Sequence, residues 1–258
     1  MPKKLKVIAV IQARMGSHRL KRKALKRILG KTLIWHIKNR LLDAKEIDEI
    51  ILSTSVLKEN DVLAKHAKSI GLKCYRGSEE DLISRLFETA KKYEADALVR
   101  ITADCPLVDP GLVDKLVRIF RRNPNKFDYL TNCYPWTFPH GLDIEIYPME
   151  TLKYLNKKIK KNSIHYREGF NLVIREQPKH FKIFNLKNPK NLFYMRWTVD
   201  WPEDFEFAKE IFKLMERDKI FKMKDILALL KQKPYLSEIN ASRKQAMPTY
   251  NLKTSLNK

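Results

Sequence analysis

The stretch Lys6-Val7-Ile8-Ala9-Val10-Ile11, close to the start of the chain, decides the fold. After Lys6 it is a continuous apolar run that is rich in β-branched side chains. Such a run is typical of a strand that is buried on both faces of a parallel sheet. The sequence therefore predicts that this segment is the first and central strand.

Helices and further strands alternate after this segment. The predicted strands are residues 6–11, 49–53, 72–75, 97–101, 127–131, 143–147, 181–186 and 194–199. The predicted helices are residues 32–42, 60–70, 79–93, 111–121, 149–161, 166–176, 203–215 and 221–231. This alternation indicates βαβ crossovers, so the predicted fold class is α/β with a mainly parallel, three-layer sheet. Ligands of such sheets bind beyond the carboxyl ends of the strands.

The composition is that of a folded, soluble protein, with 44% hydrophobic and 32% charged residues in a chain of 258. No apolar run approaches the roughly 20 residues that span a bilayer, and no signal peptide is visible, so we expect a cytoplasmic protein. Cys74, Cys105 and Cys133 fit neither a disulfide framework nor a zinc site. The net charge of +22 indicates either a polyanionic partner or adaptation to high temperature.

The segment Gln12 to Lys23, directly after the first strand, carries the sharpest functional signal. No acidic residue occurs before Asp43, while basic residues crowd this loop and the residues that follow it: Arg14, Arg19, Lys21, Arg22, Lys23, Lys26, Arg27 and Lys31. Gly16 and Ser17 permit a tight turn that exposes backbone N–H groups, which suits phosphate binding. The segment is not a Walker loop, because the spacing of that motif is absent. The alternative interpretation is a solvated basic turn.

Two carboxylates stand at the ends of other predicted strands. Asp104 follows the apolar strand 97–101 and precedes Pro106, a position that suits a divalent metal bridging phosphate oxygens. Asp200 follows residues 194–199 and could pair with Asp104 on Mg²⁺, or could merely cap the next helix. For Asp109, which precedes Pro110, helix capping is the favoured role.

The motifs together resemble the spore coat polysaccharide cytidylyltransferases, relatives of the CMP-sialic acid and CMP-KDO synthetases. The resemblance rests on Ile11 to Ser17 with Arg19, Leu20 and Lys23, then Arg76 to Asp81, Thr102 to Leu107, Gly141 to Glu145 and Arg196 to Asp200. It implies a nucleotide-diphosphosugar-transferase-like fold, CTP as donor, Mg²⁺ and a homodimer. We expect one nucleotidyltransferase domain over residues 1–240, with an acceptor or dimerisation insertion at about 132–190, and a C-terminal tail at 241–258.

The resemblance also implies roles for individual residues. Arg14, Lys23 and Asp104 would be catalytic, and Asp104 and Asp200 would hold the metal. The nucleotide would be bound by Ala13, Arg14, Gly16, Ser17, Arg19, Lys23, Ser53, Ser55, Arg76, Gly77, Ser78 and Asp104. The acceptor would be bound by His140, Gly141, Asp143, Glu145 and Arg167.

The chain departs from the family pattern at three places. Lys21-Arg22 replaces Pro-Gly, His140 replaces an arginine before Gly-Leu-Asp, and Gly169 replaces a histidine after Arg167-Glu168. The last two changes bear on the acceptor rather than on the triphosphate.

The predicted reaction is attack by an acidic sugar or sugar phosphate on the α-phosphorus of CTP, with pyrophosphate leaving. The alternatives are a non-catalytic nucleotide-binding homologue and a basic nucleic-acid-binding protein. No RNA-binding or helix-turn-helix signature supports the second, so we expect no nucleic-acid partner.

Overall fold

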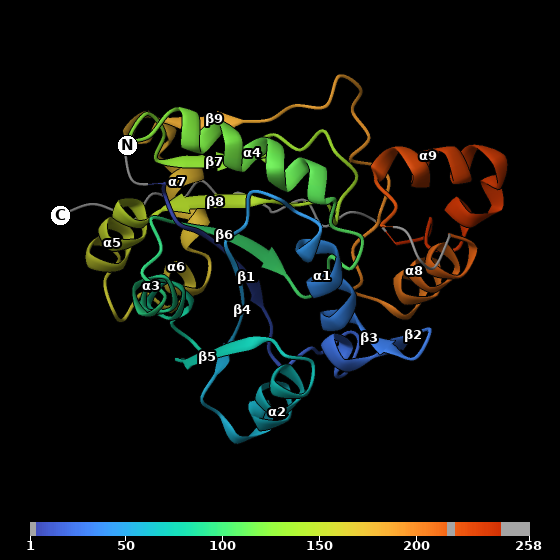
Figure 1. Ribbon diagram of the computed structural model, residues 1–258, viewed down its shortest axis with the longest axis horizontal. Coiled ribbons are helices and arrows are strands. Elements are labelled where there is room, and N and C mark those ends of the chain that lie inside the picture. The colour runs from blue at the N-terminus through green and yellow to red at the C-terminus, as the bar shows by residue number, and fades with distance from the viewer. Residues whose placement is uncertain (1–3, 216–219, 244–258) are drawn as a thin grey trace.

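The computed structural model describes residues 4–215 and 220–243 (Figure 1). The strands are β1 Val7–Gln12, β2 Arg27–Ile28, β3 Lys31–Thr32, β4 Glu49–Ser55, β5 Lys73–Gly77, β6 Ala97–Thr102, β7 Tyr129–Thr131, β8 Glu145–Pro148 and β9 Ile183–Asn185. The helices are α1 Leu33–Leu42, α2 Asp61–Ser69, α3 Leu82–Lys92, α4 Pro110–Arg122, α5 Met149–Lys158, α6 Ile164–Glu168, α7 Phe170–Glu176, α8 Pro202–Leu214 and α9 Met223–Gln232.

The central position predicted for the first strand is confirmed. Strand β1 pairs in parallel with β4 on one side and β6 on the other, in a sheet of order β5-β4-β1-β6-β8-β7-β9. Strands β5, β4, β1 and β6 run in parallel, whereas β8 is antiparallel to both of its neighbours. The fold is therefore the predicted α/β class with a mainly parallel sheet.

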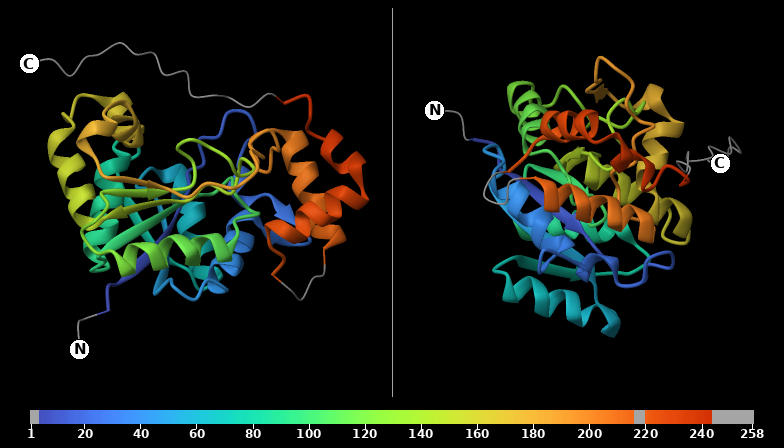
Figure 2. Two further views of the ribbon diagram at one scale, coloured as in Figure 1. Left: turned by 90° about the horizontal axis from the view of Figure 1, so that it is seen from above. Right: turned by 90° about the vertical axis from the view of Figure 1, so that its right-hand side faces the viewer.

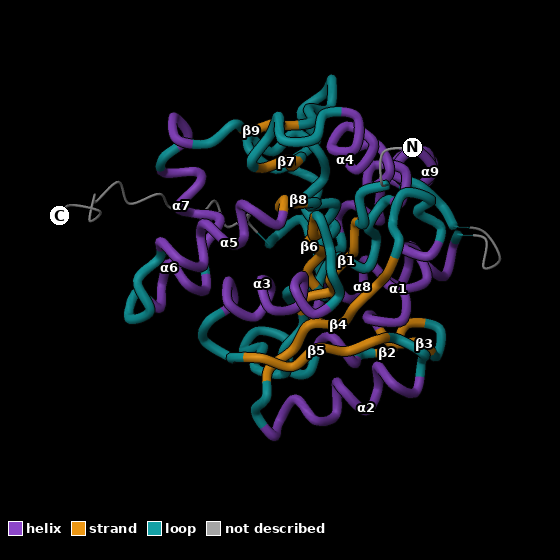
Figure 3. The backbone as a smooth tube through the Cα atoms, turned by 60° about the vertical axis from the view of Figure 1, so that its left-hand side comes forward, coloured by secondary structure: helices purple, strands orange, loops and turns teal. Residues whose placement is uncertain are grey.

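Helices cover both faces of this sheet, as Figures 2 and 3 show. Side chains of β1 alternate between the two: Val7, Ala9 and Ile11 join a core cluster with α1, α2, α4, α8 and α9, while Ile8 and Val10 join a second cluster with α3, α5 and α7. All five are fully buried. This burial on both faces is why the segment reads as an uninterrupted apolar run.

The helix predicted over residues 166–176 is interrupted. Helix α6 ends at Glu168 and α7 begins at Phe170, with Gly169 between them. Glycine has a low helix propensity, and the N–H of Gly169 closes the end of α6 by donating to the carbonyl oxygen of His165 at 2.8 Å. The prediction of one continuous helix was wrong because it passed over this residue.

The strand predicted over residues 194–199 is not formed. The backbone of this segment bonds to two loops instead: Trp197 N donates to the carbonyl oxygen of His140 at 2.7 Å, and Val199 N donates to that of Asp104 at 2.7 Å. Trp197 and Val199 are buried, which explains the apolar pattern that favoured a strand. The segment therefore ties the end of β6 to the loop before β8.

Several smaller features complete the frame. The side chain of Asp109 caps α4 by accepting from the backbone N–H groups of Gly111 and Leu112, as predicted. Within the described residues, no helix is both long enough and apolar enough to cross a bilayer. Most of the predicted tail, residues 244–258, lies outside the described residues.

Candidate functional site

The basic loop after β1 is held in place by its own backbone. Ala13 N donates to the carbonyl oxygen of Ser53 at 3.1 Å, and Met15 N donates to the side-chain oxygen of Asn60 at 2.8 Å. Asn60 is fully buried just before α2. These bonds fix the loop across the carboxyl ends of β1 and β4, where a parallel sheet binds its ligands.

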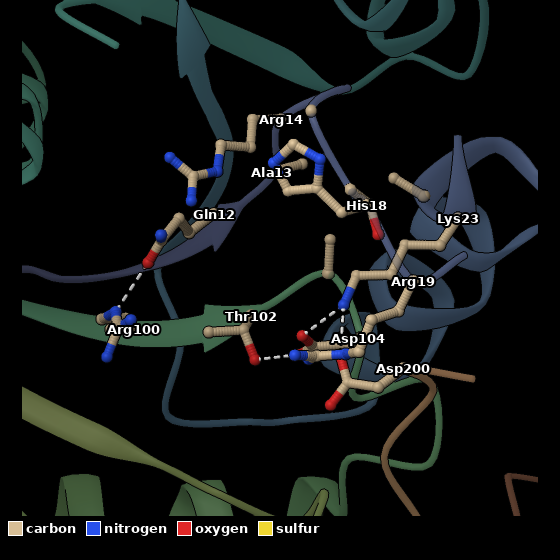
Figure 4. A pocket seen from close by; sticks show the side chains of 14 residues that line it. Gln12, Ala13, Arg14, His18, Arg19, Lys23, Arg100, Thr102, Asp104 and Asp200 are labelled. Carbon is tan, nitrogen blue, oxygen red and sulfur yellow. Dashed lines mark hydrogen bonds and ion pairs between the residues drawn. The ribbon is translucent and has the colours of Figure 1, made fainter. Parts of the chain in front are cut away.

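This loop forms one wall of a cavity of about 330 Å³ (Figure 4). The opposite wall comes from the end of β6 and from Asp200, just before α8. The sequence-predicted residues that line it are Ala13, Arg14, Gly16, Ser17, Arg19, Lys23, Asp104 and Asp200. Gln12, His18, Ala24, Arg100, Thr102 and Ala103 also line it. The cavity thus brings together residues from positions 12 to 200.

Lys23 lies between the two carboxylates. Its ammonium nitrogen donates to Asp104 Oδ2 at 2.8 Å and to Asp200 Oδ1 at 2.8 Å. Burial alone would lower the pKa of Lys23, but the two carboxylates outweigh it and raise the pKa to about 12. Lys23 is therefore charged at neutral pH, and one cation is within reach of both aspartates.

The side chain of Asp104, two residues after β6, is fixed by hydrogen bonds from its neighbours in the chain and from Lys23. One carboxylate oxygen accepts from Lys23, while the other accepts from the hydroxyl group of Thr102 and from the thiol of Cys105 at 3.5 Å. Burial opposes ionisation of this carboxyl, yet Lys23 and these hydrogen bonds hold its pKa well below the ordinary value. Asp104 therefore presents a permanent negative charge to the cavity.

Asp200 does not cap α8. Its neighbour Asp204 does so, by accepting from the backbone N–H groups of Asp200 at 3.0 Å and Trp201 at 2.9 Å. Asp204 also binds Arg196 through both carboxylate oxygens, and Asn240 donates to Asp204 at 3.0 Å. The Asp200 carboxylate is thereby left to face Lys23, Arg19 at 2.9 Å and Arg196 at 3.2 Å.

Lys23 pairs with both Asp104 and Asp200, and Arg19 pairs with Asp200 as well. These cations favour the ionised form of the Asp200 carboxyl group. Burial and the nearby Asp104 carboxylate would raise the pKa of Asp200, but Lys23 and Arg19 lower it below the ordinary value. Asp200 is therefore ionised at neutral pH. The interpretation of Asp200 as a cap is replaced by that of a carboxylate aimed at the basic loop.

The other end of the cavity holds a residue that the sequence analysis missed. Arg100, in the middle of β6, donates from Nε to the side-chain oxygen of Gln12 at 2.7 Å and from Nη1 to Glu145 (Figure 4). The signal was an arginine inside an otherwise apolar strand, since a charged side chain there needs a partner or a ligand. In Figure 4, Gln12 and Arg100 lie at the opposite side of the view from Lys23 and Asp200.

Arg14 reaches away from the two aspartates toward acidic residues of other elements. Its guanidinium lies 2.6 Å from Glu168 at the end of α6 and 3.6 Å from Glu79, before α3. Arg14 and Glu168 are both nearly half exposed. The pair therefore joins the basic loop to α6 at the rim of the cavity.

Five residues predicted to bind the nucleotide lie outside the cavity lining. Ser53 and Ser55 are fully buried in β4, where their hydroxyl groups bond to Thr89 at 3.3 Å and Asn60 at 2.8 Å. The remaining three stand at the end of β5: Arg76, Gly77 and Ser78. Arg76 donates from Nε to the carbonyl oxygen of Ser55 at 3.0 Å and pairs with Asp61 at 2.7 Å. Their role in nucleotide binding stays a prediction.

The predicted acceptor residues separate into two groups. His140 and Asp143 lie together, with 3.8 Å between His140 Nε2 and Asp143 Oδ2, next to Gly141. Gly141 has φ of +110°, and a Cβ there would lie 2.4 Å from the backbone nitrogen of Thr198. Glu145 is buried beside Arg100, whereas Arg167 is buried away from the cavity on Asp81 and Asn156.

The fold disfavours the ionisation of Asp143. Burial raises its pKa to about 6, and the charges of Glu145 and Asp104 add to this although His140 opposes it. The acceptor role of these five residues also stays a prediction. Asp143 differs from the other four because its ionised form is destabilised by burial in the folded protein.

The chain resembles known proteins over most of its length. The sequence profile described as cytidylyltransferase matches residues 8–242. An uncharacterized protein of Methanocaldococcus jannaschii is 32% identical over 243 residues, covering 93% of this chain and 97% of that protein. The spore coat polysaccharide biosynthesis protein SpsF of Bacillus subtilis is 27% identical over 235 residues, covering 88% and 95%.

The chain also resembles solved structures of nucleotidyltransferases. A cytidylyltransferase from Leptospira borgpetersenii is 32% identical, superimposes with a TM-score of 0.87, and matches 94% of this chain and 100% of that one. A CMP-2-keto-3-deoxy-manno-octonic acid synthetase complexed with CTP is 20% identical, with a TM-score of 0.62 and coverage of 81% and 98%. The second likeness supports the fold.

Proposed function

The chain belongs to the cytidylyltransferase family, and on this premise we propose that it transfers CMP from CTP to an acidic sugar or sugar phosphate and releases pyrophosphate. The observation that carries the proposal is the position of Lys23, 2.8 Å from both Asp104 and Asp200 at the foot of the basic loop. Basic side chains neutralise the oxygens of a polyphosphate, and carboxylates bind a metal ion that lies beside those oxygens. The cavity offers both in one place.

The donor set fits a divalent metal. Nucleotidyltransferases of this family typically use one, and we propose Mg²⁺. Asp104 and Asp200 would hold it, because Mg²⁺ commonly takes one or two protein carboxylates and completes its shell with phosphate oxygens and water. When bound, the ion would neutralise charge on the phosphate oxygens.

The chain's own residues bind and orient the reactants. Arg19 and Lys23 would bind the β- and γ-phosphates, and Arg14 would leave Glu168 to neutralise charge near the α-phosphorus. An acceptor oxygen then bonds to the α-phosphorus while the bond to the β-phosphate oxygen breaks, and the acceptor proton passes to water. Positioning and charge neutralisation in a sheltered cavity account for such catalysis without a covalent intermediate.

The wider setting is part of the same proposal. The Bacillus subtilis relative is a spore coat polysaccharide biosynthesis protein, which supports a surface polysaccharide or glycan precursor as the destination of the product. We propose one nucleotidyltransferase domain over residues 1–240, with residues of about 132–190 serving the acceptor or a homodimer contact, in a cytoplasmic enzyme without a nucleic-acid partner.

Pyrophosphate release tests the proposal. The four nucleoside triphosphates are each offered with Mg²⁺ and a panel of sugar acids and sugar phosphates, and turnover is expected with CTP. The Asp104→Ala variant should lose at least about 100-fold in turnover, while Asp114→Ala, on α4, should keep it. Wild-type protein that binds no CTP, as judged by a thermal shift, would exclude the proposed function. Normal turnover in Asp104→Ala would exclude the assigned role of Asp104.

A further inference from the structure

The two oxygens of the Asp200 carboxylate have different partners. Oδ1 faces the cations of the basic loop, with Lys23 Nζ at 2.8 Å and Arg19 Nη2 at 2.9 Å. Oδ2 instead accepts from Nη2 of Arg196 at 3.2 Å. Because Arg196 engages Oδ2, the direction in which Oδ1 points depends on where the guanidinium group of Arg196 is held.

The guanidinium group of Arg196 is held in turn by Asp204. Nε of Arg196 donates to Asp204 Oδ1 at 2.8 Å and Nη2 donates to Oδ2 at 2.9 Å, a two-point pairing that fixes both planar groups. Asp204 also accepts from the backbone N–H of Asp200 at 3.0 Å. Both side chains are buried, Asp204 completely. Asp204 therefore holds the backbone of Asp200 and also the arginine that contacts its carboxylate.

Asn240 completes this network from a much later part of the chain. Its side-chain nitrogen Nδ2 donates to Asp204 Oδ1 at 3.0 Å and to the backbone carbonyl oxygen of Arg196 at 2.8 Å. Asn240 is itself buried, with 4% of its surface exposed. One amide group therefore fixes the carboxylate of Asp204 relative to the backbone of Arg196.

The C-terminal segment that carries Asn240, residues 220–243, also reaches the loop that carries Asp104. Met223, at the start of α9, donates its backbone N–H to Asp109 Oδ2 at 2.7 Å. Asp109 lies in the loop that joins β6 to α4. Figure 2 shows α8 and α9 at the same end of the molecule. The C-terminal segment is thus bonded to both of the segments whose carboxylates face the basic loop.

We propose that Asn240 is a positioning residue for metal binding by Asp200. It acts through Asp204 and Arg196, which together fix the direction of the Asp200 carboxylate. This inference rests on the proposed function, in which Asp104 and Asp200 hold Mg²⁺. Because Mg²⁺ demands regular octahedral geometry, a carboxylate that is free to turn away binds it less tightly. Residues that orient metal ligands typically contribute about 10- to 100-fold to metal affinity.

The test compares Asn240→Ala and Asn240→Ser with the control Asn123→Ala. Asn123, at the end of α4 and outside the cavity lining, makes the same kind of bond, from Nδ2 to the carbonyl oxygen of Ile119 at 2.9 Å. Metal binding is measured at fixed CTP without acceptor, as the Mg²⁺ or Ca²⁺ concentration at the midpoint of the rise in melting temperature. Calorimetry in EDTA measures CTP binding without metal, and pyrophosphate release is followed with Mg²⁺ varied.

We expect Asn240→Ala to raise the Mg²⁺ midpoint about tenfold or more, whereas Asn123→Ala should match wild type. The Ca²⁺ midpoint should rise less, because Ca²⁺ accepts less regular geometry. CTP affinity in EDTA should change little, because Ser53 and Asn60 still hold the basic loop. Excess Mg²⁺ should restore most of the turnover of Asn240→Ala. The Asn240→Ser variant keeps a donor, so its Mg²⁺ midpoint should be intermediate, and it decides the test if Asn240→Ala does not fold.

Other results would overturn the inference. A lower melting temperature of the Asn240 variants with an unchanged Mg²⁺ midpoint would reduce Asn240 to a stabilising contact. A parallel loss of CTP affinity in EDTA would show that the C-terminal segment shapes the whole cavity rather than the Asp200 carboxylate. A wild-type protein whose melting temperature does not respond to Mg²⁺ would remove the metal site and the inference with it. Each of these can occur while wild type binds CTP, so the proposed function fails separately, when wild type binds none.

Discussion

The ammonium nitrogen of Lys23 lies 2.8 Å from Oδ1 of Asp200, although 177 positions separate the two residues in the chain. Asp104, 81 positions from Lys23, lies at the same distance on the other side. In this arrangement the lysine neutralises two carboxylates that would otherwise repel each other. A metal bound to both would have the same effect, so Lys23 could then turn toward the phosphates.

Removing the charge of Lys23 should therefore affect both activity and stability. The Lys23→Met variant should lose about 100- to 1,000-fold in CTP turnover. Its melting temperature should fall because Asp104 and Asp200 are left close together without their cation. Millimolar Mg²⁺ should raise the melting temperature of this variant more than that of wild type, because the ion takes the place of the lysine.

The matched control is Lys26→Met, which removes a lysine of the same region whose Nζ lies 5.4 Å from the ring of Phe205. It should keep turnover within about twofold of wild type. Lys23→Met with equal turnover, or with no added response to Mg²⁺, would contradict the role given to Lys23.

In the proposed mechanism, Glu168 would compete with the nucleotide for Arg14, to which it is paired at 2.6 Å. Because both side chains are nearly half exposed, their pair contributes at most about 1 kcal/mol. The Glu168→Gln variant should release Arg14 and bind CTP up to about fivefold more tightly. Isothermal titration with CTP measures the change, and Glu176→Gln on α7 serves as control. Weaker CTP binding in Glu168→Gln would show that the pair supports the nucleotide site instead.

Asp143 should make stability depend on pH between about 4 and 6. Burial raises its pKa to about 6 from an ordinary 3.8, so the folded state favours the protonated form. That stabilisation is complete below the ordinary value and is lost as the pH rises through 6. An Asp143→Asn variant stays neutral, so its advantage should appear from pH 4, grow to about 1 to 3 kcal/mol near pH 6 and then level off.

Urea unfolding of both proteins at a series of pH values measures this difference. Glu150→Gln, at a side chain that is 84% exposed, should not reproduce it. An Asp143→Asn variant that is less stable than wild type at pH 8 would refute the assigned direction of the shift. Lower turnover in the stabilised variant would indicate that the costly carboxylate serves the reaction.

Gly141 should tolerate no side chain. Its φ is +110°, and an added Cβ would meet the backbone of Trp197 and Thr198 at 2.4 to 2.5 Å. Gly141→Ala should destabilise the fold by about 3 kcal/mol or more, because backbone rather than a movable side chain must shift. Gly30→Ala, at φ +78° with open space around the Cβ, should cost only about 1 kcal/mol. Equal losses of melting temperature in the two variants would contradict this account.

Local sequence signals were enough for the part of the site that depends on strand ends. The apolar run of β1 predicted a central strand. Lys23 lies in the basic loop that follows β1, and Asp104 follows the end of β6, so both were expected at one edge of the sheet. The sequence indicated Asp200 as a candidate but did not decide whether it caps α8. The structure shows that Asp204 caps this helix, which leaves the Asp200 carboxylate available to the basic loop.

Features that depend on pairing between distant segments escaped prediction. Arg100 makes sense only opposite Glu145, and the strand order that places β8 beside β6 cannot be read from either segment alone. Residues 194–199 have the composition of a strand but bond to loops. Ser53 and Ser55 are polar residues at a strand end, which is where ligand-binding residues are expected. Their hydroxyl groups instead form hydrogen bonds inside the protein, with Thr89 and Asn60.

The hydrogen bond from Asn240 to Asp204 helps to fix the segment of Asp200, and all three residues are translated long after the basic loop. The cationic segment leaves the ribosome first, whereas its balancing carboxylate follows 177 positions later, about 10 to 35 s at ordinary elongation rates of about 5 to 20 residues per second. Throughout that interval the nascent chain carries its lysines and arginines without Asp200. The proposed nucleotide site is therefore complete only after Asp204 and Asn240 have also been translated, because they hold the segment that carries Asp200.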